Sequence, residues 1–272
     1  MQVSIMQEQA AIANDNASKV SKTLMKPGLD KKLLADILSY TQAALLKDKG
    51  PIWNYLTQEK GYSESVIKAL EVGLLSSKRL LEQHLKDLGW ADSKINEISK
   101  ALGLIGKTHK LLIPCKNREG QLIGFAARNP FCKEDDALGK YLYSKGVPQT
   151  GVLFNIQNAK GKELFIVEEP LDCLYLSASG FENAVAIGAD FSDESQFVNI
   201  KKLGIEKVTL LDQSDQIIEL IFDVLSETAP NIAIFEILLP DDIENLNSLL
   251  KAQGLEMLKE LYTTSVPVKF ED

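Results

Sequence analysis

The chain has 272 residues, a net charge of −8 and a composition that is 45% hydrophobic and 25% charged. These values are typical of a globular protein, and they exclude wholesale disorder and a collagen-like fibre. No run of about 18 apolar residues, the length needed to cross a bilayer, is present. The polar start does not read as a secretory signal, and three cysteines are too few for a disulfide framework, so we expect a cytoplasmic protein without a membrane partner.

The first part of the chain is predicted to be a flexible arm followed by a helical region. Residues 1–28 are polar and end in the breaker Lys26-Pro27-Gly28. Over residues 29–105, apolar side chains recur at three- and four-residue spacings, and Gly50-Pro51 ends the first helix. Shorter helices are expected around 52–60, 63–70, 78–88 and 92–102.

Residues 106–160 are predicted to form a small basic region that contains β-strands. Two strands should flank an Asn-Arg-Glu-Gly turn at 117–120, and a short strand at 141–143 should interrupt a surface loop. Between 106 and 150 there are eight basic and four acidic residues, on a chain that is acidic as a whole. A local basic face of this kind indicates an anionic ligand, although a solvated lysine-rich surface would give the same pattern.

Residues 161–272 alternate between strands and helices. Apolar strands are expected at 164–167, 184–187, 207–211 and 232–238, with helices at 171–179, 193–203, 216–225 and 245–262. This alternation predicts an α/β fold with a parallel four-stranded sheet covered on both faces. Neither a glycine-rich dinucleotide motif nor a P-loop follows any of the strands.

Carboxylates stand at the end of every strand of this predicted sheet. Ligand sites of open parallel sheets lie at the carboxyl ends of the strands. Oxygen ligands without His or Cys suit Mg²⁺ or Mn²⁺, so the sequence predicts a divalent-cation site there. Alternatively, single acids in these places serve as loop residues and helix caps. The residues concerned are Glu168, Asp172, Asp190, Asp212, Asp215, Asp241 and Asp242.

Several segments of the chain carry a family resemblance. The segments FIVEEPLDCLYLSASGFENAVAIGADFSDESQ and VTLLDQSD resemble the Toprim fold of primases, topoisomerases and some nucleases. In that fold a Glu ends the first strand, an Asp follows four residues later and a D-x-D ends the third strand, which Glu168, Asp172 and Asp212 match. The segments LLIPCKNREGQLIGFAARN and GKYLYSKGVPQTGVLFNIQNA resemble the RNA polymerase core of DnaG-type bacterial primases, and the resemblance covers roughly residues 55–262.

The resemblance implies a metal-dependent nucleotidyltransferase that acts on single-stranded DNA or RNA with nucleotide triphosphates. Glu168 and Asp212 would be catalytic and would hold the metal together with Asp215. A basic ridge would guide the template or the nucleotide, formed by Arg128, Lys140, Lys110, Arg118 and Lys107. The zinc-ribbon and helicase-binding modules of such primases have no counterpart here, which implies a protein partner that supplies them.

The motifs also depart from the family pattern. Ser214 replaces the second acid of the D-x-D, Asp215 comes one place late, and Glu169 stands where the family has glycine. We therefore expect weakened metal binding and catalysis. Two alternatives stay open: a Toprim nuclease that hydrolyses phosphodiesters, and a non-catalytic module that binds nucleic acid or protein.

Overall fold

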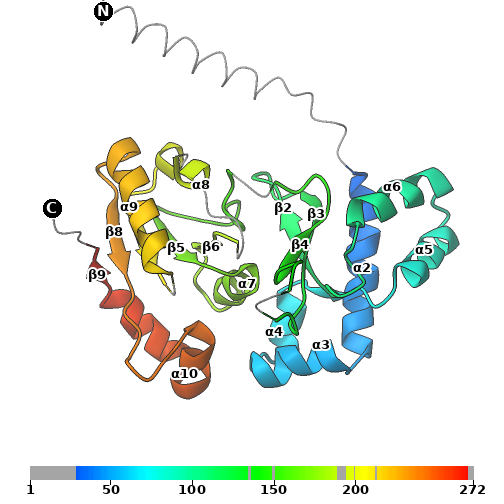
Figure 1. Cartoon of the computed structure of the whole chain (residues 1–272), viewed down its shortest axis with the longest axis horizontal. Helices are drawn as coiled ribbons and strands as arrows, with labels where there is room; N and C mark the ends of the chain where they lie inside the picture. Colours follow the sequence, from blue (N-terminus) through cyan, green and yellow to red (C-terminus); the bar gives the residue numbers. More distant parts are fainter. Residues whose placement is uncertain are drawn as a thin grey trace, which may run out of the picture.

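The computed structural model describes residues 29–133, 136–148, 151–188, 194–198, 200–211 and 213–268. Within them the chain forms two halves, each with its own β-sheet, and helix α7 (Pro170–Ala178) lies at their junction (Figure 1). The mixed α/β fold predicted from the sequence is confirmed. The predicted arm, residues 1–28, lies outside the described residues.

The first half begins with helices whose starts are set by local chemistry. Helix α2 (Lys31–Lys47) begins after Asp30, whose carboxylate accepts hydrogen bonds from the backbone N–H groups of Lys32 and Leu33. Helix α3 (Pro51–Asn54) begins with proline, which lacks the N–H that a first helical residue leaves unpaired. It continues into a π-helical turn, η1 (Tyr55–Glu59), in the stretch predicted as one α-helix. The remaining predicted helices are α4 (Glu64–Ala69), α5 (Lys78–Asp87) and α6 (Asp92–Leu102).

An antiparallel sheet follows, in the order β1-β2-β3-β4. The predicted hairpin is formed by β2 (Leu111–Lys116) and β3 (Leu122–Arg128), and the predicted short strand is β4 (Tyr141–Tyr143). Strand β1 (Gly73–Leu74) was not expected, because a glycine within a helical pattern predicts a break between helices. A Cβ atom on Gly73 would lie 2.3 Å from the Thr41 hydroxyl oxygen, so the absence of a side chain lets α2 and β1 approach each other.

Both faces of this sheet are covered. One face, with Leu112 and Phe125, packs on α2, α5 and α6. The other face, with Ile113 and Ala126, packs on α3, η1 and α4, and Leu171 of α7 belongs to the same apolar cluster. The two halves are therefore joined by buried hydrophobic contacts.

The second sheet has the strand order β6-β5-β7-β8-β9. Strands β5 (Glu163–Val167), β6 (Ala184–Ala186), β7 (Lys207–Leu210) and β8 (Ala233–Glu236) run parallel, as predicted. Strand β9 (Val266–Pro267) pairs antiparallel with β8 at the edge of the sheet. It was not predicted, because two residues are too few to show a strand pattern.

Helices cover both faces of this sheet, because successive side chains of each strand point to opposite sides. Ile166 and Leu210 face α9 (Asp215–Thr228) and α8 (Glu194–Val198), while Phe165 and Val167 face α7 and α10 (Leu246–Thr263). The predicted helix 193–203 is divided between α8 and a 3₁₀ turn, η2 (Ile200–Leu203).

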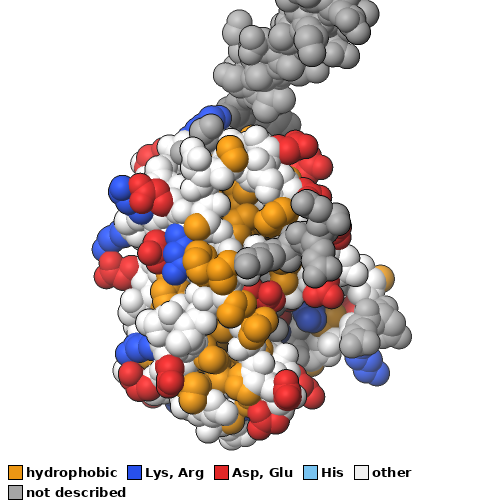
Figure 2. Space-filling view, turned by 90° about the vertical axis from the view of Figure 1, so that its left-hand side faces the viewer, with side chains coloured by type: hydrophobic (Ala, Val, Ile, Leu, Met, Phe, Trp, Pro, Cys, Tyr) orange, Lys and Arg blue, Asp and Glu red, His pale blue; other side chains and the backbone are white. Residues whose placement is uncertain are grey.

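The surface of the second half is mixed in character. Seen from the α9 and α10 side, a central band of hydrophobic side chains is bordered by scattered acidic and basic ones, so this face is not the predicted basic ridge (Figure 2). In the part of the chain that the structure describes, none of the helices combines the length and apolarity needed for a membrane span.

Candidate active site

A cleft of about 430 Å³ lies between the two halves, where strand β5 ends and helix α7 begins. Its walls come from both sheets and from the π-helical turn. Glu168, Glu169 and Asp172 line it from the second half, and Lys60, Arg128 and Lys140 line it from the first. The cleft thus brings acidic and basic side chains together from distant parts of the sequence.

Glu168 is the first residue after β5, and its side chain is exposed to the cleft. Its position is held by the backbone, since its carbonyl oxygen accepts a 3.0 Å hydrogen bond from the Gly188 N–H. Strand β7 is the parallel neighbour of β5, with Ile166 paired to Leu210, so the carboxyl ends of these two strands are adjacent. Asp212, the predicted partner of Glu168, lies outside the described residues, and the distance between their carboxylates stays a prediction.

Glu169 is bound by the protein's own cations. An Arg128 guanidinium nitrogen donates to its carboxylate and also donates, over 2.6 Å, to the Tyr141 hydroxyl. The Arg128 and Glu169 side chains are only 11% and 13% exposed, and the Lys140 ammonium nitrogen is 3.9 Å from the other carboxylate oxygen. Burial alone would lower the pKa of Arg128, but Tyr141 and Glu169 outweigh it and raise that pKa, so the guanidinium is charged.

Asp172 is bound in the same manner by Lys60. The ammonium nitrogen of Lys60 is 2.7 Å from the Asp172 carboxylate, and the two side chains are 8% and 15% exposed. The Tyr62 hydroxyl donates a second hydrogen bond to that carboxylate over 3.3 Å. Burial opposes the charge of Lys60, yet Asp172 more than compensates and raises its pKa. Of the three acids around the start of α7, Glu168 alone is exposed.

The π-helical turn explains how Lys60 and Tyr55 reach the cleft. A π-turn adds a residue to the helical repeat and re-aims the side chains around it, which is why such turns recur at functional sites. Lys60 closes η1 by donating its backbone N–H to the Tyr55 carbonyl. Tyr55 lines the cleft, but its hydroxyl is buried from solvent and has no hydrogen-bond partner among the described residues.

Further acids lie near the ends of β7 and β8. Asp215 is the first residue of α9 and is exposed. The exposed Ser214 occupies the N-cap position of that helix, without a side-chain hydrogen bond to it, at the place of the second acid of the D-x-D. Glu236 ends β8, and its pKa is raised by partial burial and by the negative charge of Asp215. Glu236 was not predicted as a site residue, because it lies inside a predicted strand. Asp190, which was predicted, lies outside the described residues. Among the described residues no three acidic, His or Cys side chains are grouped closely enough to hold a metal ion.

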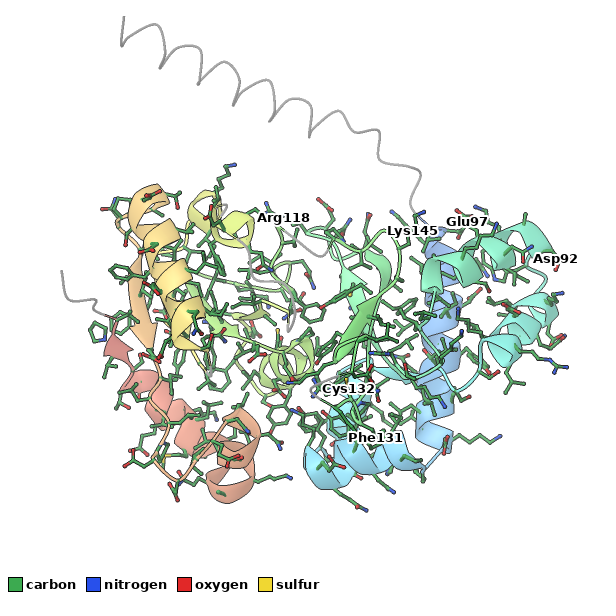
Figure 3. All side chains as sticks on the ribbon, in the orientation of Figure 1. Asp92, Glu97, Arg118, Phe131, Cys132 and Lys145 are labelled. Carbon is green, nitrogen blue, oxygen red and sulfur yellow. The ribbon has the colours of Figure 1, made fainter. Side chains whose placement is uncertain are left out.

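The predicted basic residues do not all lie together. Lys140 and Arg128 line the cleft, whereas Arg118 lies in the β2–β3 turn and lines a second pocket of about 400 Å³. Lys107 and Lys110 precede β2, at the opposite end of that strand from Arg118. Figure 3 likewise separates Arg118, near the top of the β2–β4 sheet, from Phe131 and Cys132 near its lower end.

Known proteins resemble this chain in sequence, although no protein-family model matches it. A DNA primase of Chlamydia muridarum is 26% identical over 230 residues, which cover 79% of this chain and 37% of the relative. A DNA primase of Clostridium acetobutylicum is 25% identical over 231 residues, which cover 77% and 37%, respectively. The chain therefore spans little more than a third of the length of these relatives.

Solved structures show the same fold. The zinc-binding and RNA polymerase domains of the Aquifex aeolicus primase match with a TM-score of 0.69 and 20% identity, over 94% of this chain and 67% of that one. The RNA polymerase domain of Mycobacterium tuberculosis primase DnaG matches with a TM-score of 0.68 and 22% identity, over 87% and 84%. A second structure of that domain, in complex with a double-stranded DNA oligomer with a 6-nucleotide overhang, matches with a TM-score of 0.69 at 22% identity, over 87% and 80%. The chain has the fold of the catalytic core of DnaG-type primases.

Proposed function

We propose that this chain binds single-stranded nucleic acid in its central cleft and joins nucleotides there, as a primase-type nucleotidyltransferase core. The observation that carries the proposal is Glu168, an exposed carboxylate at the carboxyl end of β5 that faces a cleft bordered by Lys140. The cleft places a potential ligand for a cation and a side chain that can neutralise phosphate within one concave site. The primase relatives, and a structural neighbour solved with DNA, support a nucleic-acid ligand.

We propose that a divalent cation binds where β5 and β7 end. Mg²⁺ takes hard oxygen ligands, is often held by one or two protein carboxylates, and fills its other positions with water and substrate phosphates. Glu168 would hold it together with Asp212 and Asp215. When bound, such an ion neutralises charge on a reacting phosphate. Lys140 would orient the polyanion.

A second candidate function rests on the ion pairs of the same cleft. Glu169 and Asp172 are neutralised by Arg128 and Lys60, and Ser214 supplies no carboxylate. These contacts reduce the negative charge that would attract a cation, so they favour a primase-derived module that binds nucleic acid without chemistry. Protein partners that supply the zinc-ribbon and helicase-binding functions are compatible with either candidate.

The two candidates separate in one experiment. The purified chain is incubated with single-stranded DNA and labelled nucleotide triphosphates in Mg²⁺ or Mn²⁺, and cation binding is measured by calorimetry. We expect template-dependent product that Glu168→Gln abolishes and that Glu182→Gln, at an exposed glutamate outside the cleft, leaves unchanged. Cleavage of DNA without nucleotides would instead identify a nuclease. DNA binding without product or cation binding would establish the non-catalytic module.

A further inference from the structure

The turn that follows β3 presents an aromatic side chain to solvent beside the cleft. Phe131 is 56% exposed, and among the large hydrophobic side chains that the described residues expose it is the only aromatic one. The preceding residue, Pro130, lines the cleft together with Lys140. Figure 3 shows Phe131 and Cys132 near the lower end of the β2–β4 sheet. A phenylalanine that is exposed to this extent gains only part of the hydrophobic stabilisation that full burial of its ring would supply.

The turn is held in place by a set of short-range bonds. The Asn129 side-chain oxygen accepts a 3.1 Å hydrogen bond from the Phe131 N–H, and the Asn129 N–H donates over 3.0 Å to the carbonyl of Lys140. The Cys132 thiol lies 3.0 Å from the Gly139 carbonyl, which also contacts the ring of the buried His109. These bonds tie the backbone on either side of Phe131 to the segment that carries Gly139 and Lys140, so the turn brings Phe131 close to Lys140 along the chain fold.

The charge of the surroundings selects the kind of partner. Lys140 has a side chain that is 53% exposed, and its ammonium group is 3.9 Å from Glu169, a distance that leaves it able to contact a phosphate as well. Lys133, two residues after Phe131, is also exposed. An aromatic face beside cationic side chains is the arrangement by which proteins bind single-stranded nucleic acid, since bases stack on the ring while phosphates meet the cations. A purely apolar peptide would gain nothing from the two lysines.

We propose that Phe131 is a stacking platform for an unpaired base of a single strand at the mouth of the cleft, with Lys140 contacting a neighbouring phosphate. This inference rests on the proposed nucleic-acid function and adds a residue that the primase-like motifs do not include. The base stacks through its π-face, so the platform accepts any base.

The test uses the full chain and a labelled oligothymidine that carries single 5-iodouracil substitutions. Fluorescence anisotropy measures affinity, and irradiation followed by peptide mapping locates the crosslink. We expect a crosslink at Phe131 and a loss of affinity of about 5- to 160-fold in Phe131→Ala, the range that removal of one stacked base implies. Phe131→Tyr should bind as the wild type does. Lys140→Ala should reduce the dependence of affinity on salt, whereas Phe131→Ala should leave that slope unchanged.

Two control variants separate base stacking from a purely apolar contact and from a general effect of surface substitution. Phe131→Leu keeps an apolar side chain but removes the π-face, so its affinity should resemble that of Phe131→Ala. Wild-type affinity in Phe131→Leu would overturn the inference in favour of a purely apolar contact with the oligonucleotide. Leu80→Ala, at a 57% exposed residue of α5, should change nothing. Binding that is unaffected by Phe131→Ala, with crosslinks elsewhere, would overturn the stacking site while the proposed function stands. Failure of the wild type to bind the oligonucleotide at low salt would refute the proposed function itself.

Discussion

Replacing Lys60 by methionine should destabilise the protein strongly, because it would leave a buried carboxylate without its cation. Lys60 and Asp172 are 8% and 15% exposed and 2.7 Å apart. Removing one partner of a buried ion pair costs about 3–5 kcal/mol. Asp172 keeps its hydrogen bond from Tyr62 and some contact with water, so we expect the lower end, about 3 kcal/mol. In a chain of this size that corresponds to a melting temperature lower by about 6–12 °C.

Denaturation in urea, followed by circular dichroism, measures this loss directly. The matched control is Lys160→Met, which removes the cation of a surface pair at a similar distance of 2.9 Å but with side chains that are 73% and 63% exposed. Exposed pairs contribute roughly 0–1 kcal/mol, so the control should change little. The double variant Lys60→Met/Asp172→Leu should recover most of the stability, since an apolar pair of similar volume carries no buried charge.

The same pair gives a pH dependence with a defined sign. The pKa of Lys60 is raised in the folded protein above its ordinary value of 10.5, because Asp172 outweighs the effect of burial. A raised pKa stabilises the fold at every pH below the unfolded value, and this contribution disappears as the pH rises through the folded value. The difference between wild type and Lys60→Met should therefore be constant at neutral pH and shrink above about pH 10.5. Equal stability of Lys60→Met and Lys160→Met at pH 7 would refute the reasoning.

Two other changes test the cleft. Lys140→Ala should lower the slope of log affinity for single-stranded DNA against log salt by about 0.7, measured by anisotropy, and an unchanged slope would remove Lys140 from the interface. Ser214→Asp places another residue type that is favoured at helix N-caps before α9 and adds the carboxylate that the D-x-D pattern lacks, so Mn²⁺ affinity measured by calorimetry should rise. Unchanged cation binding in Ser214→Asp would show that this strand end does not form a metal site.

The elements that could be predicted from the sequence are those with a strong repeating pattern. The four parallel strands are short apolar runs, and the β2–β3 hairpin is marked by a turn containing Gly120. The missed elements have no such pattern: β1 and β9 are two residues each, and the π-helical turn lies in a stretch whose sequence pattern fits an ordinary α-helix. Glu168 could be found because the carboxyl end of a parallel strand is a general site for ligands.

The partners within the site could not be predicted in this way. Lys60 meets Asp172 across 112 residues of sequence, and nothing near Lys60 distinguishes it from a surface lysine. Arg128 stays a predicted contact for nucleic acid, and the structure shows that it also forms a nearly buried pair with Glu169, which the sequence did not indicate. The ligand of a charged residue can therefore be inferred only when the residues that surround it in space are known, and the sequence alone does not give them.

The two buried ion pairs give the cleft its geometry as well as its charge. Each joins the start of α7 to the first half of the molecule: Asp172 to Lys60 at the end of η1, and Glu169 to Arg128 at the end of β3. Glu168 directly precedes this turn, so the bonds that hold α7 also position the backbone of Glu168 at the cleft. An apolar pair could hold the helix as firmly, but it would lack the directional bonds that fix this one arrangement. A change at Glu169 or Asp172 should therefore alter ligand binding through the position of Glu168, even though neither side chain has to touch the ligand.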